Sequence, residues 1–438
     1  MTEPTTLYQR PAELLQNLIR FDTTNPPGNE AECIAYIDGL LQSLGIETTI
    51  LAKEPARANL IARLKGSGSA PPLLLYGHVD VVSTAGQKWT HPPFSGDLID
   101  GYIWGRGALD MKGGVAMLLA AFMRAKAENL SLPGDVILCV VSDEEVDVGF
   151  GVSYLVAEHA DRFEGVRYAL GEFGGFAFYV GDKRFYPIMT AEKQVCWMRA
   201  TIHGPGGHGS TPLRGGATAR LAKFLHTLDR KRLPVHITPI ARQMIETMTA
   251  ELPRPARTLL SQLLNPMLTD RILDVLGERG RTFNPLLHNT ATPTMLKGGT
   301  QVNVIPAEIT VDLDGRLLPG FSPDDMLREL RNLVGEDIEL EVVVYQPGPP
   351  EPDMSLYHML AGVLREADPT GTPTPLLLSG VTDGRHFAKL GIQTYGFLPM
   401  KLPPDFNFAQ TIHAADERIP ANALDFGADA IYTALQRF

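Results

Sequence analysis

The segment LLLYGHVDVV, residues 73–82, constrains the fold more than any other stretch of this sequence. Its near-continuous run of apolar residues predicts a β-strand buried on both faces, which is typical of a parallel sheet between layers of helices. His78 and Asp80 nevertheless lie inside this strand, and burying such polar groups is costly unless they have partners. The segment therefore indicates an α/β fold and, within it, a polar site.

Helix and strand patterns alternate along the first 170 residues, which predicts a largely parallel sheet. Pro11 opens one amphipathic helix, and Gly45 follows the end of another. Helices are expected over 11–19, 30–44, 152–159 and from 112 onward, and strands over 48–51, 59–64, 135–142 and 168–170.

The pattern changes near residue 190, where VCWMRATIH alternates apolar and polar residues like a half-exposed strand. We predict a small α+β domain of split β-α-β type over 190–348, inserted into a catalytic domain formed by 1–189 and 349–438. A helical insertion is expected at about 239–280. Its apolar residues either pack the small domain, which is the commoner case, or line a pocket for an apolar substrate.

Composition narrows the class of protein. The 438 residues are 44% hydrophobic and carry a net charge of −11, which indicates a folded globular chain and argues against a nucleic-acid or anionic-membrane surface. The three cysteines form no CxxC pair, and the N-terminus has no apolar signal segment. We therefore expect no disulfides, no membrane association and a cytoplasmic location.

Polar residues follow several of the predicted strands, where the carboxyl ends of parallel strands form a ligand-binding crevice. Two histidines and several carboxylates, without cysteine, make a ligand set that suits zinc, manganese or cobalt. Glu144 and Glu145 are adjacent at the end of a predicted strand, and burying two like charges there is costly unless a cation neutralises them. The candidates are His78, Asp80, Asp110, Glu144, Glu145, Glu172 and His413.

Each of these signals is weak alone, because an isolated HxD or acidic pair is usually structural or solvated. GPGGHG, residues 204–209, formally matches a dinucleotide-binding pattern, but Thr211-Pro212 interrupts the turn that would precede a helix. The sequence has no HExxH, GxSxG or P-loop motif. A nucleotide-dependent enzyme and a metal-free binding protein stay open as alternatives, although the first lacks its glycine loop and the second would be expected to have lost ligands.

Taken together, four motifs are distinctive. YGHVDVV (76–82), the Trp89–Phe94 loop, DGYIWGRGALDMKGG (100–114) and SDEEV (142–146) strongly resemble the metallopeptidase family 20. The resemblance extends from about residue 10 to the end, apart from the helical insertion. It implies a catalytic domain of the zinc-exopeptidase type with an inserted lid and dimerisation domain.

The resemblance implies two divalent metal ions, most simply zinc, with cobalt or manganese as alternatives. Asp110 would bridge both ions, Glu144 would act as general base and acid, and Asp80 would orient His78. It also implies a cis peptide between Asp110 and Met111. Glu172 stands where many members have aspartate, which suits the acylase and carboxypeptidase branches. The implied ligands are His78 and Glu172 for one ion, Glu145 and His413 for the other, and Asp110 for both.

Further residues resemble the substrate side of the family's site. His208, in GGHGSTP, matches a histidine that reaches the active site of a neighbouring subunit, which implies a homodimer through the inserted domain. Asn303 in QVNVIP and Arg316 in GRLLPG match substrate-anchoring residues. Gly380 and Thr382, in SGVTDGRHF, match a loop on the substrate side.

These observations predict a di-metal hydrolase that cleaves the amide bond of N-acyl amino acids, or of small peptides with a free carboxylate. An acylase or carboxypeptidase of apolar substrates is favoured by the apolar insertion. A deacetylase or desuccinylase of amino-acid biosynthesis, or a dipeptidase, is the alternative; the doubly anionic substrate of a desuccinylase would want more basic residues.

Overall fold

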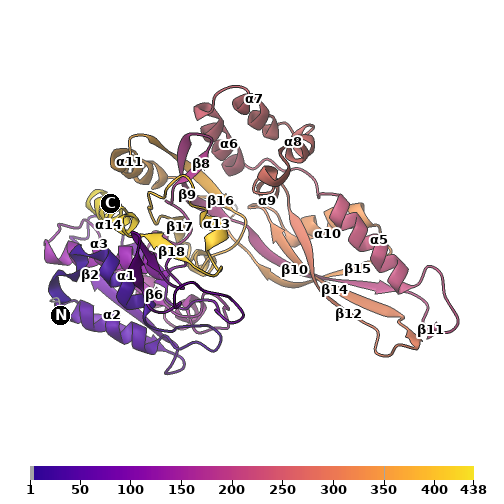
Figure 1. The fold of residues 1–438 in the computed structure, drawn as a ribbon, viewed down its shortest axis with the longest axis horizontal. Coiled ribbons are helices and arrows are strands. Elements are labelled where there is room, and N and C mark those ends of the chain that lie inside the picture. Colours follow the sequence, from indigo (N-terminus) through magenta and orange to yellow (C-terminus); the bar gives the residue numbers. More distant parts are fainter. Residues whose placement is uncertain (1–3, 350) are drawn as a thin grey trace. The chain divides into compact units, whose positions relative to one another are not determined.

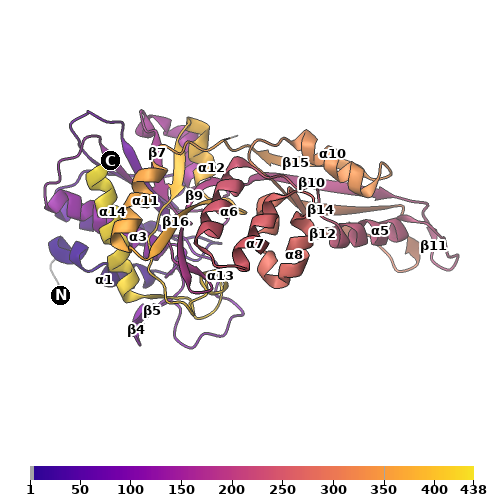
Figure 2. The same ribbon diagram turned by 90° about the horizontal axis from the view of Figure 1, so that it is seen from above.

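The computed structural model describes residues 4–349 and 351–438, and the chain divides into two compact units (Figures 1 and 2). Unit 1 comprises the chain up to Thr190 together with Asp353–Leu376 and Thr382–Phe438, and unit 2 comprises Ala191–Pro352 and Leu377–Val381. Strands β9 (Lys183–Glu192) and β16 (Gly371–Leu378) carry the chain from one unit to the other.

A nine-stranded sheet forms the centre of unit 1, in the order β1-β2-β6-β3-β7-β17-β9-β16, with β8 paired to β9. Its middle strands β6, β3, β7 and β17 pair in parallel, whereas the pairs β1–β2, β2–β6 and β17–β9 are antiparallel. The other strands are β1 (Thr48–Ala52), β2 (Ala58–Leu64), β3 (Leu73–His78), β6 (Val136–Val141), β7 (Tyr168–Gly171), β8 (Phe178–Val180) and β17 (Gln393–Gly396).

Both faces of this sheet are covered. Leu73 and Leu75 of β3 enter one hydrophobic cluster, while Leu74 and Tyr76 enter another on the opposite face. The first cluster contains α1 (Pro11–Ile19), α2 (Ala31–Ser43), α3 (Lys112–Ala127), α11 (Tyr357–Ala367) and α14 (Ala421–Arg437), and the second contains α4 (Val152–Glu158) and α12 (Gly384–Phe387). This arrangement confirms the α/β class and explains why β3 is apolar on both faces.

Unit 2 contains a four-stranded antiparallel sheet in the order β12-β14-β10-β15, with helices on one face. In β10, Cys196 and Met198 are buried while Trp197 is 46% exposed, as the alternating pattern predicts. The elements are β10 (Gln194–His203), β11 (Gly207–His208), α5 (Ala217–Arg230), β12 (Thr290–Gly298), β13 (Val304–Ile305), β14 (Glu308–Leu317), α10 (Pro323–Val334) and β15 (Glu339–Gln346).

Unit 2 also contains the helices α6 (Pro239–Glu251), α7 (Ala256–Ser261) and α8 (Thr269–Leu276), which lie in the segment predicted as a helical insertion, and α9 (Asn284–Leu287) after it. Met244, Ile245, Leu263 and Leu273 are buried, whereas Met267 is 88% and Val275 72% exposed. Such burial is what the packing alternative predicts.

Two further features bear on the class of protein. All three cysteines are buried and free. Among the helices of the described residues, none combines the length and the apolar character needed to cross a bilayer.

Candidate metal centre

The candidate ligands of unit 1 gather at one edge of the large sheet. His78 ends β3, Glu144 and Glu145 follow β6, and Glu172 follows β7. Because these strands run parallel, their carboxyl ends meet at the same edge. Asp110 joins them from the turn before α3. Strands β4 (Asp97–Ile99) and β5 (Tyr102–Trp104) precede Asp110 in the sequence. Helix α13 (Phe408–Thr411) and strand β18 (Arg418–Pro420) flank His413.

Two groups of three side chains could each hold a metal ion, and Asp110 belongs to both. In the first group, His78 Nε2 lies 3.2 Å from Asp110 Oδ1 and 3.4 Å from Glu172 Oε2. In the second, His413 Nε2 lies 3.1 Å from Asp110 Oδ2 and 3.4 Å from Glu145 Oε1. Asp110 therefore turns one oxygen to each group, as a bridging ligand would.

The donor set fits divalent cations. It contains only imidazole nitrogens and carboxylate oxygens, which suits zinc, manganese or cobalt. Oε1 of Glu145 and Oε1 of Glu172 are buried without a hydrogen-bond partner in the described part of the chain. Buried carboxylate oxygens of this kind need a compensating cation, and a metal ion in each group would supply it.

The electrostatics of the metal-free cluster point the same way. Contacts with Asp110 and Glu145 raise the pKa of His413 to about 10. Burial alone would lower the pKa of His78, but its hydrogen bonds with Asp110, Asp80 and Glu172 raise it well above its ordinary value. The carboxylates thus hold a positive charge on each imidazole, in places where a divalent cation would replace the proton.

Glu144 stands beside the two groups without belonging to either. Its Oε2 lies 4.0 Å from His78 Nε2, and its side chain is 14% exposed. Burial, followed by the charge of Glu172, raises its pKa well above the ordinary value. A carboxyl group in this position can exchange a proton with a molecule at the metal groups.

Asp80 is fully buried and supports several neighbours. Its Oδ1 accepts a hydrogen bond from the backbone N–H of Glu144, and its Oδ2 accepts one from the N–H of Glu145, both at 3.1 Å. Its Oδ1 also lies 3.3 Å from His78 Nδ1. Asn25 Nδ2 donates to Asp80 Oδ2 at 2.9 Å. Asp80 therefore contacts the imidazole and hydrogen-bonds to the backbone that carries both glutamates.

The substrate-side candidates lie in different parts of the molecule. Thr382 belongs to unit 1. Gly380 belongs to unit 2, together with His208, Asn303 and Arg316. His208 pairs with Val304 in the small β11–β13 ladder, so it lies beside Asn303. Arg316 lies near the end of β14. The Asp110–Met111 peptide is cis, as the resemblance implied.

Some residues near the cluster escape sequence reasoning. Asn25 is one, because its importance comes from a contact with Asp80 that spans 55 positions. Asp383 is another: it is buried, its Oδ2 has no hydrogen-bond partner in the described residues, and burial raises its pKa well above the ordinary value. Its position next to Thr382 was the available signal.

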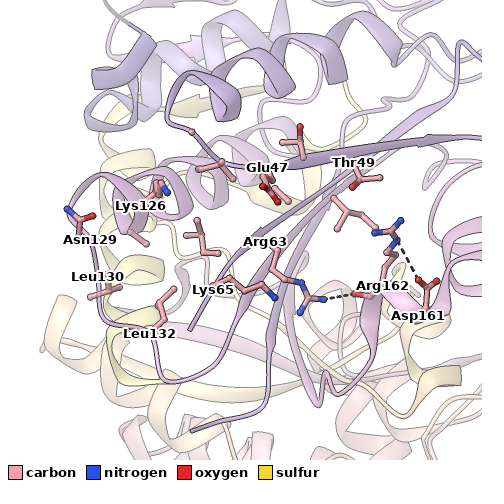
Figure 3. A pocket seen from close by; sticks show the side chains of 17 residues that line it. Glu47, Thr49, Arg63, Lys65, Lys126, Asn129, Leu130, Leu132, Asp161 and Arg162 are labelled. Carbon is pink, nitrogen blue, oxygen red and sulfur yellow. Dashed lines mark hydrogen bonds and ion pairs between the residues drawn. The ribbon is translucent and has the colours of Figure 1, made fainter. Parts of the chain in front are cut away.

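A cavity of about 840 Å³ lies elsewhere in unit 1 (Figure 3). It is lined by the end of β2, and Leu64 there pairs with Val136 at the start of β6. The cavity therefore lies at the sheet edge opposite the metal cluster. Its Arg63 and Lys65 both pair with the single carboxylate of Asp135.

Comparisons with known proteins point to one family. A protein-family model described as peptidase family M20/M25/M40 matches residues 74–437. Aminoacylase-1 of Sus scrofa is 26% identical over 96% of this chain and 93% of its own. The N-fatty-acyl-amino acid synthase/hydrolase PM20D1 of Bos taurus is 28% identical over 85% of this chain and 75% of its own.

A solved structure shares the fold over the full length. The M20 family metallo-carboxypeptidase Sso-CP2 of Sulfolobus solfataricus superposes with a TM-score of 0.69, covering 100% of this chain and 99% of its own at 18% identity. The probable carboxypeptidase S-like 2 of Dictyostelium discoideum is 27% identical in sequence over 83% of this chain and 71% of its own.

Proposed function

Because the chain belongs to peptidase family M20/M25/M40 and is therefore a metal-dependent hydrolase, we propose that it cleaves the amide bond of N-acyl amino acids, or of small peptides with a free carboxylate. The observation that carries the proposal is the pair of ligand groups that share Asp110. The names of the relatives, an aminoacylase and an N-fatty-acyl-amino acid synthase/hydrolase, favour acyl substrates.

In this proposal His78, Asp110 and Glu172 hold one divalent ion, and Asp110, Glu145 and His413 hold the other. Zinc is the simplest choice, and cobalt and manganese suit the same ligands. Bound ions of this kind supply Lewis acidity and lower the pKa of water. The absence of paired cysteines favours the cytoplasm.

Glu144 would accept a proton from the attacking water and then deliver it to the leaving nitrogen. Arg316 would bind the substrate carboxylate through Nη1, which is buried without a hydrogen-bond partner among the described residues, while its Nε and Nη2 donate to Asp314. His208 would donate a hydrogen bond to the oxyanion of the tetrahedral intermediate. Asn303, Gly380 and Thr382 would contact the rest of the substrate.

The Glu144→Gln substitution tests the proposed mechanism. Hydrolysis of an N-acyl amino acid should fall by about 10²–10⁴-fold, because the amide cannot transfer the proton. Metal content by plasma emission spectroscopy should not change, since Glu144 belongs to neither ligand group. Glu32→Gln, at an exposed position of α2, is the control. Undiminished turnover of Glu144→Gln would remove Glu144 from the mechanism.

An apolar wall beside the ligands favours apolar substrates. Asp110 and Glu172 share a small cavity of about 20 Å³ with Phe176 and Phe408, whose rings stack with centroids 4.0 Å apart. Such a space holds about one water molecule. Because Phe408 is only partly buried on α13, its movement would open the wall to an apolar group next to the scissile bond.

Phe408→Ala should therefore raise kcat/KM for N-decanoyl amino acids relative to N-acetyl amino acids by about tenfold, since each buried methylene is worth about fourfold in affinity. A second series that varies the amino-acid side chain distinguishes the acyl end from the amino end. Phe406→Ala, which removes a ring that stacks on Tyr102, is the control. Equal selectivity ratios in both variants would show that the wall does not contact substrate.

We also propose that the active form is a homodimer, because unit 2 separates its substrate residues. Strand β11, which contains His208, lies beyond one end of β14 (Figure 1), and His208 pairs with Val304, the neighbour of Asn303. Arg316 lies near the other end of β14 and pairs with Val195 and Thr290. Ten strand residues at about 3.3 Å each make this separation roughly 30 Å. A substrate of amino-acid size cannot span it, so His208 and Arg316 would serve the same substrate only from two different chains.

Mixing two inactive variants tests this arrangement. His208→Ala and Glu144→Gln should each be inactive as homodimers, whereas their mixed dimers contain one intact site. Random reassociation should restore roughly a quarter of wild-type activity, because half of the dimers are mixed and each has one working site of two. A mixture that stays inactive after exchange, or an active monomer in sedimentation experiments, would contradict the proposal.

A further inference from the structure

Glu417 is a fully buried carboxylate that binds the backbone of the turn carrying Asp110. Its Oε1 accepts hydrogen bonds from the N–H of Leu109 at 2.7 Å and of Asp110 itself at 3.2 Å. Its Oε2 accepts from the N–H of Gly107 at 3.1 Å. Three backbone donors of residues 107–110 therefore converge on one side chain.

Arg106 completes this arrangement and extends it to His413. It is fully buried, and its Nη1 donates to Glu417 Oε2 at 2.6 Å. Its Nη2 donates to the backbone oxygen of His413 at 3.3 Å and to Gln87 Oε1 at 2.8 Å. Gln87 in turn donates to the same backbone oxygen at 2.9 Å.

The backbone of His413 needs such support. Its φ of 59° lies in the left-handed region, which is unfavourable for a residue other than glycine. A residue in this conformation persists where its surroundings over-determine it. Two hydrogen bonds to its carbonyl oxygen supply that constraint.

From this network we infer that Glu417 and Arg106 are positioning residues that set the geometry of the ligand group Asp110, Glu145 and His413. The inference rests on the proposed function and deepens it. A buried ion pair by itself contributes little net stability. Here Glu417 and Arg106 form hydrogen bonds with the backbone of two ligands, Asp110 and His413. Such contacts are typical of residues that do not bind the metal themselves but tune its site.

Glu417→Gln keeps the shape of the side chain. Its amide NH₂ group is a donor and would face backbone N–H groups, which are donors too. The substitution also removes the charge that pairs with Arg106. Zinc titration of the chelator-treated protein, against a competing chelator of known affinity, should show two binding events in the wild type. In the variant one of them should be weakened by about 10–100-fold, while the other, which includes His78 and Glu172, should change much less.

A second buried pair provides a matched control. Arg57 Nε binds Glu30 Oε2 at 2.8 Å, and Glu30 contacts no ligand of either group among the hydrogen bonds of the described residues. Glu30→Gln should lower the melting temperature about as much as Glu417→Gln does. It should change the affinity for neither zinc ion by more than about twofold. If Glu417→Gln bound both zinc ions as tightly as Glu30→Gln does, Glu417 would have a purely structural role and the inference would be overturned.

Gln87→Met decides the matter if Glu417→Gln does not fold, because Gln87 lies in a partly exposed loop. Its loss should weaken the affinity for the same zinc ion by about threefold or more. An unchanged affinity would overturn the inference. A wild-type protein that binds no zinc would instead refute the proposed function itself, so the two failures are distinguishable.

Discussion

The crowding of negative charge at one edge of a parallel sheet is the constraint on which the rest of this structure depends. The strand ends and the turn before α3 bring two imidazoles to the same place as four acidic side chains, namely Asp110, Glu144, Glu145 and Glu172. In a dry environment such a cluster is unstable unless cations compensate it. The layers of helices that bury the sheet on both faces thus create a site that could hold metal ions.

The hydrogen bonds of the buried carboxylates separate them into two kinds. Asp80 and Glu417 have their oxygens occupied by backbone N–H groups, so they are saturated and act on the protein. Glu145 and Glu172 each keep one buried oxygen that accepts no hydrogen bond in the described chain, although that of Glu145 lies 3.4 Å from His413 Nε2, so these oxygens can face an ion. The difference lies in the hydrogen bonds each group makes rather than in the residue type, which is acidic in both cases.

This difference also marks the limit of sequence reasoning. The apolar run of β3 was enough to predict a strand buried on both faces, and the motifs around His78, Asp110 and Glu145 were dense enough to identify a family. Strand β16 contains Pro373 and Pro375 and lies at the edge of the sheet, which is where proline is tolerated within a strand. Glu417 and Asn25 escaped because their contacts join residues hundreds or tens of positions apart.

The metal content of the purified protein tests the central claim most directly, when it is measured together with hydrolysis of N-acyl amino acids before and after chelation. The account predicts about two divalent ions per chain, loss of hydrolysis when a chelator removes them, and recovery when zinc or cobalt is added back. A protein that contains no metal and hydrolyses these substrates equally well in the presence of chelator would contradict it.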